Sequence, residues 1–202
     1  MPDPGTLVHK GLFMATPDPR ERLFDEYLAA SARAGSRIAL AQLAERFQPR
    51  LLGHARRLTG NAEAARDAVQ EAWIEIVRGL ARLDDATAFP AWAFRIVSRR
   101  CARWVRKTQQ RRRLDTAYAA EPAELTTRDA GERALDAARL ARAMANLSPD
   151  HRAAIALFYL EDLSVPEIAV ALDVPSGTVK TRLMHARENL RRSLNLKETG
   201  NE

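Results

Sequence analysis

Apolar residues recur along this chain at the spacing of an α-helix, and no segment alternates between apolar and polar residues with the period of a β-strand. This pattern favours helices that bury one face and disfavours half-buried strands. Glycine is sparse, with 9 in 202 residues, so the helical pattern is interrupted in few places. We therefore predict an all-α protein.

Interruptions of this pattern divide the chain into two small helical domains joined by a linker. We predict an N-terminal flexible arm at 1–20, a helical domain at 21–107, a linker at 108–131 and a second helical domain at 132–197. Gly60-Asn61 and residues 84–90 interrupt the first domain. The predicted linker combines charged residues with Pro122 and lacks periodicity.

The composition argues against several classes of protein. The longest apolar run, residues 153–160, is too short to cross a membrane, and the first twenty residues lack the apolar core of a signal peptide. Cys101 is the only cysteine, so an internal disulfide cannot form, and no Cys/His cluster has the spacing of a metal site. No catalytic arrangement of nucleophile, carboxylates or glycine loop is present in the sequence. We expect a cytoplasmic protein that is not an enzyme and needs no cofactor or metal.

Basic residues are concentrated in two blocks. The chain has a net formal charge of +6. Residues 95–113 hold nine basic residues and no acid, residues 114–136 hold six acids against two arginines, and residues 176–197 hold six basic residues against one acid. A merely soluble protein intersperses its charges, so this segregation favours a polyanionic partner over a solubilising surface.

The helix predicted after Gly60-Asn61 has two distinct faces. Asn61 suits its N-cap, and apolar residues at helical spacing, Trp73 and Val77 among them, form a core face. The other side carries a stripe that is polar except for one isoleucine: Asp67, Gln70, Glu71 and Ile74. Both a solvated face and a docking surface for a partner helix would explain this stripe.

The next helix is predicted to begin near Pro90, whose fixed φ suits a first turn. One side of it carries a basic stripe, formed by Arg95, Arg99, Arg103 and Arg106. Neighbouring like charges repel each other, and nothing within the helix compensates them, so an external anion explains the stripe. With Trp92 as an exposed stacking ring one turn earlier, the stripe suits single-stranded or melted nucleic acid. In the alternative, Trp92 is a core residue and the arginines pair with acids elsewhere.

The C-terminal domain predicts a helix-turn-helix. Ser164 and Glu167 fit a capping box before a short helix, Asp173-Val174-Pro175 breaks the chain, and a longer cationic helix begins near Ser176. The second helix of such a motif can enter the major groove. Its outer face presents side chains that read bases or hold phosphates: Thr178, Lys180, Thr181, Arg182, His185 and Asn189. A plain helical hairpin is the alternative.

Three segments in this order resemble the extracytoplasmic-function (ECF) sigma factors of the sigma-70 family. Residues 64–73, AARDAVQEAW, resemble the family's DAEDLVQETF segment, and residues 89–96, FPAWAFRI, resemble its FRAWLFRIA segment. Residues 163–187 resemble its GLSYEEIAELL…GTVKSRL…AR signature. Other helix-turn-helix proteins share parts of this last signature, whereas the first two segments single out a sigma factor.

The resemblance implies a role for each predicted surface. The sigma-2-like domain, 21–107, would bind the clamp helices of the largest core RNA polymerase subunit through the stripe that contains Asp67. The same domain would capture the melted minus-10 element through Trp92 and the basic stripe. The sigma-4-like domain, 132–197, would bind the minus-35 duplex and contact the polymerase flap. The linker would thread the catalytic cleft, where its acids would mimic nucleic acid.

Three positions depart from the family pattern. Arg99 and Arg103 stand where the family often has Asn and Asp in the segment that reads the minus-10 element. His185 stands where the recognition helix often has an arginine. The resemblance therefore transfers neither base preference to this chain.

A conventional helix-turn-helix regulator that binds duplex DNA without polymerase is the competing function. The basic stripe and the Gln70-Glu71 segment argue against it, because such a regulator has a different N-terminal domain. The family further implies promoter DNA as a ligand and control by a separate anti-sigma factor, without membrane insertion.

Overall fold

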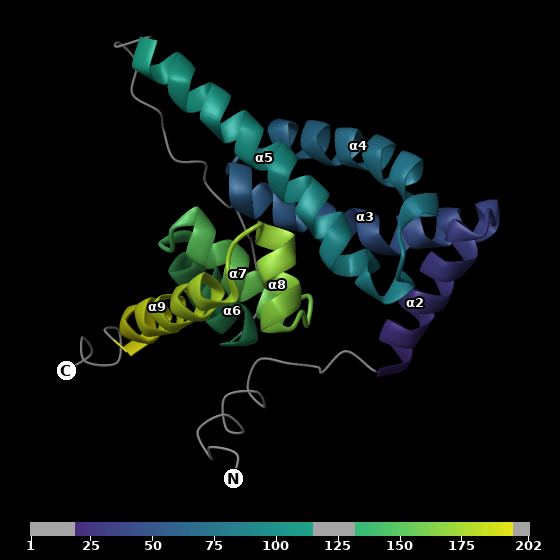
Figure 1. The fold of residues 1–202 in the computed structure, drawn as a ribbon. Coiled ribbons are helices and arrows are strands. Elements are labelled where there is room, and N and C mark those ends of the chain that lie inside the picture. The colour runs from purple at the N-terminus through teal and green to yellow at the C-terminus, as the bar shows by residue number, and fades with distance from the viewer. Residues whose placement is uncertain (1–18, 115–131, 196–202) are drawn as a thin grey trace.

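The computed structural model describes residues 19–114 and 132–195, which form helices and contain no strand. Figure 1 shows them in two groups. The N-terminal domain comprises α2 (Pro19–Arg33), α3 (Arg37–Thr59), α4 (Ala62–Gly79) and α5 (Phe89–Leu114), with two short 3-10 helices, η1 (Leu80–Arg82) and η2 (Ala86–Ala88). The C-terminal domain comprises α6 (Glu132–Ala145), α7 (Pro149–Tyr159), α8 (Val165–Leu172) and α9 (Ser176–Asn195). The prediction of two helical domains is confirmed. Residues 1–18 of the predicted arm and 115–131 of the predicted linker lie outside the described residues.

Helix α3 forms the centre of the N-terminal domain and packs against α2, α4 and α5. Its apolar face, including Phe47 and Leu51, is fully buried. Phe47 meets Phe89 at the start of α5 edge to face, with 5.0 Å between ring centroids. Burial of each such side chain contributes about 1.5–3 kcal/mol, so the contact fixes the first turn of α5 against α3.

One polar side chain lies inside this core. His54 of α3 is fully buried, and its Nε2 lies 2.9 Å from the Ser98 hydroxyl of α5. The Ser98 hydroxyl itself donates to the Phe94 carbonyl. Burial first, and the nearby Arg57 charge second, lower the pKa of His54 to about 3. The imidazole is therefore neutral near pH 7 and joins α3 to α5.

The C-terminal domain contains the predicted helix-turn-helix. Ser164 and Glu167 form both hydrogen bonds of the capping box at the start of α8. Asp173 ends α8 in the left-handed conformation, with φ of 57°, and α9 begins three residues later. Val179, Leu183 and Ala186 of α9 are buried, while the opposite face points outward.

The structure differs from the sequence expectation at three places. Residues 34–36 separate α2 from α3: Gly35 has a φ of 99°, and the Ser36 side chain caps α3. Helix α5 continues to Leu114, beyond Lys107, where we predicted the domain to end. Val77 is 51% exposed and does not belong to the core face of α4.

The two domains lie against each other. Helix α8 packs on α5, and α7 packs beside α3, an arrangement that Figure 1 shows with the C-terminal domain beneath α5. A cavity of about 500 Å³ remains between α2 and α3 on one side and residues 160–163 on the other. None of the described helices is both long and apolar enough to span a bilayer.

Candidate functional site

The predicted docking stripe lies on the outer face of α4. Asp67, Gln70, Glu71 and Ile74 are all exposed, and the isoleucine side chain is 50% exposed. Val77, three residues after Ile74, extends this apolar part of the stripe. Its position three residues after Ile74 was a sequence signal that Val77 belongs to the docking stripe, but we had assigned Val77 to the core face. Together the two side chains form an apolar end to an otherwise polar face.

One member of the docking stripe already has a partner inside the domain. Arg100 of α5 donates to Glu71 at 2.8 Å and to Glu75 at 2.6 Å. These two hydrogen bonds, one to each carboxylate, tie α4 to α5. Asp67 has no ionic partner among the described residues. Within the stripe, Glu71 is thus engaged in a contact inside the domain, whereas Asp67 is available to a partner.

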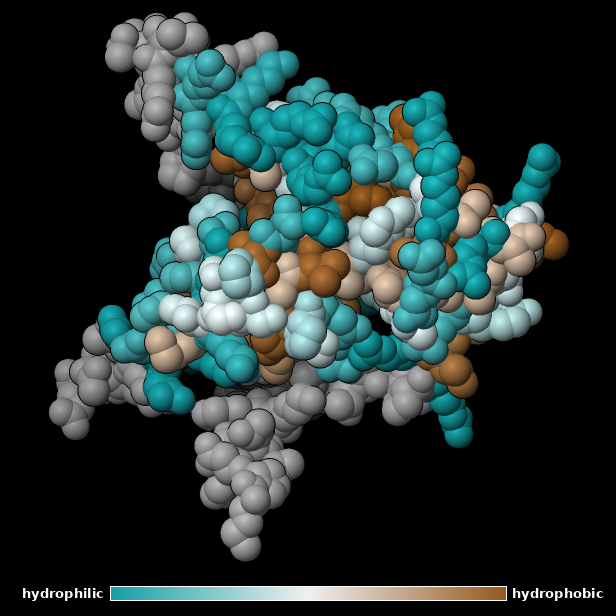
Figure 2. All heavy atoms as spheres, viewed as in Figure 1, coloured by the Kyte–Doolittle hydropathy of each residue, from teal (hydrophilic) through white to brown (hydrophobic). Residues whose placement is uncertain are grey.

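The basic stripe on α5 is less isolated than its sequence indicated. Arg95 donates to Asp173 at 2.7 Å, and the Arg99 guanidinium lies 4.0 Å from Glu75. No acid within α5 compensates the arginines, but Arg95 pairs with an acid at the end of α8, so the alternative of pairing with acids elsewhere applies there. Arg103 and Arg106 are exposed. Figure 2 shows mostly hydrophilic side chains on the upper part of the N-terminal domain.

The Trp92 ring is not fully exposed. Its side chain is half-buried and packs against the core of the N-terminal domain, 6.1 Å from Phe89 between ring centroids. A Cβ atom on Gly79 would lie 2.9 Å from the ring, so the glycine leaves the room that the indole occupies. The expectation of an exposed ring is corrected: packing against the end of α4 covers one side of it.

Helix α9 presents the predicted recognition face, although not evenly. Lys180, Thr181, His185 and Asn189 are exposed, and Thr178 is half-buried. Arg182 has a side chain only 20% exposed, because it donates to Asp150 of α7 at 2.5 Å. The start of α7 thus holds one of the six predicted base-reading or phosphate-binding side chains.

The surroundings of His185 also involve α7. Its ring lies 6.1 Å from the His151 ring, and its Nδ1 lies 3.9 Å from the Glu188 carboxylate. Met184, the residue before it, is 56% exposed. We had not predicted that this methionine is exposed. Its position between Leu183 of the core face and His185 of the outer face was the only sequence signal for it.

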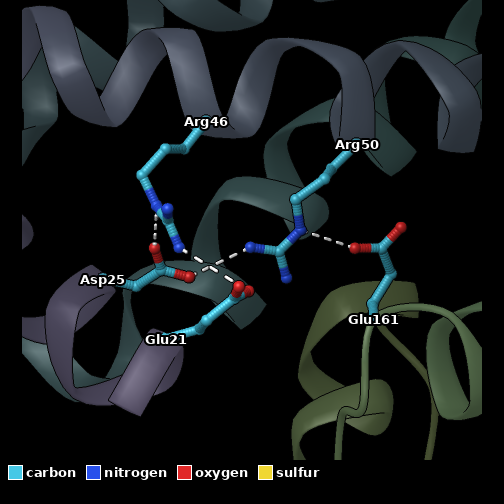
Figure 3. Close-up of polar contacts among 5 residues, drawn as sticks. All are labelled: Glu21, Asp25, Arg46, Arg50 and Glu161. Carbon is cyan, nitrogen blue, oxygen red and sulfur yellow. Dashed lines mark hydrogen bonds and ion pairs between the residues drawn. The ribbon is translucent and has the colours of Figure 1, made fainter. Parts of the chain in front are cut away.

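An ion-pair network that we had not predicted from the sequence lies at the boundary between the domains (Figure 3). Asp25 of α2 accepts from Arg46 at 2.6 Å and from Arg50 at 3.1 Å, both on α3. Arg50 also donates at 2.7 Å to Glu161, which follows α7 in the other domain. Asp25 and Glu161 are buried, at 7% and 8% exposed. Glu21 completes the group at 3.9 Å from Arg46.

Comparisons with known proteins find one matching family region in each of the two domains. Residues 43–112 match the family "Sigma-70 region 2", and residues 137–190 match "Sigma-70, region 4". The ECF RNA polymerase sigma factor SigL of Mycobacterium tuberculosis is 33% identical over 173 residues, which cover 85% of this chain and 96% of the relative.

Two solved structures share the fold. The structure of CnrH in complex with the cytosolic domain of CnrY has a TM-score of 0.58 at 26% identity, and covers 86% of this chain and 98% of that one. The sigma factor RpoE in complex with the anti-sigma factor NepR from Bartonella quintana has a TM-score of 0.61 at 23% identity, and covers 77% and 96%. With a matching region in each domain and a relative matched along nearly its whole length, this chain belongs to the ECF family of RNA polymerase sigma factors.

Proposed function

We propose that this chain binds core RNA polymerase and directs transcription initiation at promoters that it selects through their minus-10 and minus-35 elements. The observation that carries the proposal is the presence, in one chain, of an outward stripe on α4 and a helix-turn-helix with an outward recognition face. The protein works as an initiation factor beside polymerase in the cytoplasm, and it needs no catalytic site or cofactor of its own.

The N-terminal domain, from residue 21 into α5, binds polymerase through the docking stripe. Ile74 and Val77 supply apolar area that is exposed in the chain alone, and Asp67 supplies a carboxylate without an internal partner. Exposed apolar side chains within a polar rim are typical of protein interfaces. The clamp helices of the largest polymerase subunit are the partner that we assign to this face.

The same domain captures the melted minus-10 strand through α5. Arg103 and Arg106 are exposed and can hold phosphates, while Arg95 and Arg99 reach the DNA only after leaving their carboxylates. The uncovered part of the Trp92 ring offers a surface on which a base can stack. The four arginines and this ring together form the proposed minus-10 site.

The C-terminal domain, residues 132–197 by our sequence division, binds the minus-35 duplex through α9 and contacts the polymerase flap. Thr181, His185 and Asn189 face outward and can reach base edges, and Lys180 can hold a phosphate. Thr178 and Arg182 lie at the edge of this face. The acids that we predict to mimic nucleic acid lie at 115–136; residues 115–131 among them are outside the described residues.

We further propose that a separate anti-sigma factor controls this chain. The support is the likeness to RpoE, whose solved structure contains the anti-sigma factor NepR. That likeness, at 23% identity, shows the shared fold.

Run-off transcription from a promoter library tests the proposed function. Core polymerase with this chain should transcribe a subset of templates that share two elements, whereas either component alone should transcribe none of them. The competing regulator function predicts the opposite: tight, specific binding of duplex DNA by the chain alone, and no transcripts that depend on it. Gel-shift assays with the selected promoters, without polymerase, separate the two outcomes.

A further inference from the structure

Two histidine rings from different helices lie next to each other at the edge of the proposed recognition face. His151 is in the first turn of α7, and His185 is in the middle of α9. Their ring centroids are 6.1 Å apart, and the rings are tilted by 33°. His185 is exposed and His151 is half-buried. Because His185 lies one helical turn from Thr181 and from Asn189, the pair adjoins the face that the proposed function assigns to the minus-35 duplex.

Neither ring is used to hold the fold together. The His151 ring has no hydrogen bond or ion pair among the described residues. His185 has one ionic contact, in which its Nδ1 lies 3.9 Å from the Glu188 carboxylate. Arg192 already binds that carboxylate. The ring nitrogens of both histidines can therefore donate to a ligand.

The charged groups around the histidine pair are largely paired with one another. Asp150 of α7 accepts from Arg182 of α9 at 2.5 Å, and Glu188 is bound by Arg192. Helices α3, α6 and α8 also pack on α7 or α9, but within the described residues they make no ionic contact with either ring. Protonation of the pair would thus add positive charge to this edge, opposed in the described part of the chain by Glu188 alone.

Two imidazoles in this arrangement fit a phosphate better than a metal ion. Histidine changes its charge between about pH 5 and 8, and the protonated ring donates from both of its nitrogens. Hydrogen bonds from a charged donor to a phosphate oxygen are short and strong. Each ring can donate to one of the two non-bridging oxygens of a phosphodiester. Among the described residues, no group of three or more His, Cys, Asp or Glu could hold a metal ion.

We propose that His151 and His185 together hold one backbone phosphate of the minus-35 duplex, and that they do so in their protonated form. This inference rests on the proposed function, which supplies the duplex, and adds to the site a residue of α7 that lies outside the helix-turn-helix. Two protonated rings 6.1 Å apart repel each other in the free chain, whereas a phosphate attracts both. DNA binding therefore takes up protons.

The proton uptake makes the affinity for the duplex depend on pH. A histidine is charged at the acidic end of its range and loses its charge as the pH rises. The affinity is therefore highest at the acidic end and falls toward about pH 8. An arginine, which the family often has at the position of His185, stays charged throughout this range. The pH dependence is thus a property of this chain.

The test measures how tightly the holoenzyme, core polymerase with the full chain, binds a labelled duplex that carries only the minus-35 element of a promoter selected by run-off transcription. His151→Gln and His185→Gln remove the titratable group and keep a polar side chain. His9→Gln is the matched control, because His9 lies outside the described residues. His151→Lys restores a charge that does not titrate between about pH 6.5 and 8. Circular dichroism at both pH values checks the fold of each variant.

We expect wild type and His9→Gln to bind the duplex about tenfold more tightly at pH 6.5 than at pH 8, because at least one proton is taken up. His151→Gln and His185→Gln should each reduce this ratio to about threefold or less. His151→Lys should bind at pH 8 more tightly than wild type, since its charge persists.

A second series replaces single phosphates of the duplex by uncharged methylphosphonates. One replacement should reduce the pH dependence of wild type to that of His151→Gln, and the same replacement should leave the ratio of His151→Gln nearly unchanged. Equal ratios for His151→Gln and His9→Gln, or a wild-type ratio that no single replacement alters, would overturn the proposal.

Failure of the proposed function would show separately. If the chain binds duplex DNA without polymerase and supports no transcripts, it is not an initiation factor. The pH ratios of the same variants, measured on the duplex selected by gel shift, then still decide whether the histidine pair holds a phosphate.

Discussion

The outer face of α4 and the first turns of α5 belong to the same domain and differ in what covers them. On α4, Ile74 is 50% exposed and Asp67 has no ionic partner among the described residues. On α5, Arg95 is paired with the other domain, and α8 packs on the helix. One proposed surface is open in the chain alone, whereas the other is partly occupied.

This difference suggests an order of events. A polymerase that docks on α4 meets a surface that needs no rearrangement. DNA that approaches the start of α5 must displace Asp173 from Arg95.

The largest expected effect concerns the open surface. Ile74→Asp should weaken binding to core polymerase about 100-fold, because burial of an isoleucine contributes about 1.5–3 kcal/mol and a buried, unpaired carboxylate adds a further cost. Titration of the labelled chain with polymerase measures the change. Ile38→Asp is the control, since Ile38 on α3 is 74% exposed and outside the stripe. Equal weakening by both variants would mean that α4 has no special role.

The second effect concerns the core on which both surfaces depend. In the unfolded chain His54 has its ordinary pKa near 6.5, whereas burial and Arg57 lower the folded value to about 3. The unfolded state therefore binds an extra proton below pH 6.5, and the free energy of unfolding should fall by up to about 1.4 kcal/mol per pH unit from there toward pH 3.

Urea unfolding between pH 4.5 and 7.5 measures this slope. His54→Gln keeps a polar group near Ser98 without a proton that titrates in this range, so its slope should be shallower than that of wild type. Identical slopes would show that other groups cause the acid sensitivity and that the bond between α3 and α5 is not its origin.

The third effect concerns base selection by the outer face of α9, which, like the outer face of α4, is exposed in the chain alone. His185→Arg should increase selection for guanine at one position of a randomised minus-35 element about tenfold, because arginine contacts guanine at two acceptors and such a pair contributes about 1–3 kcal/mol. Imidazole lacks this fork. Sequencing of transcripts made with core polymerase measures the selection. If Thr181→Ala and Arg182→Ala change the selection and His185→Arg and His185→Ala do not, His185 plays no part in reading the element.

The smallest effect compares two arginines of α5 in the free chain. Arg103→Ala should reduce the slope of log affinity against log salt for a single-stranded oligonucleotide by about 0.7, because one phosphate contact is lost. Arg95→Ala should leave the slope nearly unchanged, since Asp173 already occupies that guanidinium. Anisotropy titrations at four salt concentrations measure both values. Equal reductions would show that Arg95 is as accessible as Arg103.

Local features of the fold could be read from the sequence because their causes are local. The capping box at Ser164 and the N-cap at Asn61 join residues three apart, and both form as expected. The break before α3 was missed although Gly35 and Ser36 are ordinary signals of a helix end and a helix start. The helical pattern on either side of them is so regular that it concealed the break.

The partners of the charged site residues could not be read in this way. Arg95 and Asp173 are 78 residues apart, and Arg50 and Glu161 are 111 apart, so no spacing rule connects them. The burial of Trp92 could not be predicted from spacing either. Its position on a helical face indicated an exposed ring, but contact with the end of α4 buries part of it. Sequence patterns assign a face to a residue, and the packing of other helices decides whether that face is free.

The close approach of Trp92 to Gly79 has a consequence for the evolution of this protein. A Cβ atom at position 79 would lie 2.9 Å and 3.2 Å from two atoms of the indole ring, so each position limits what its counterpart can become. We expect descendants of this chain to accept a larger residue at 79 only together with a smaller ring at 92. The two positions are thirteen residues apart, and substitutions at them should occur together: a change of the ring at position 92, in the proposed minus-10 site, should accompany a change of residue at the end of α4.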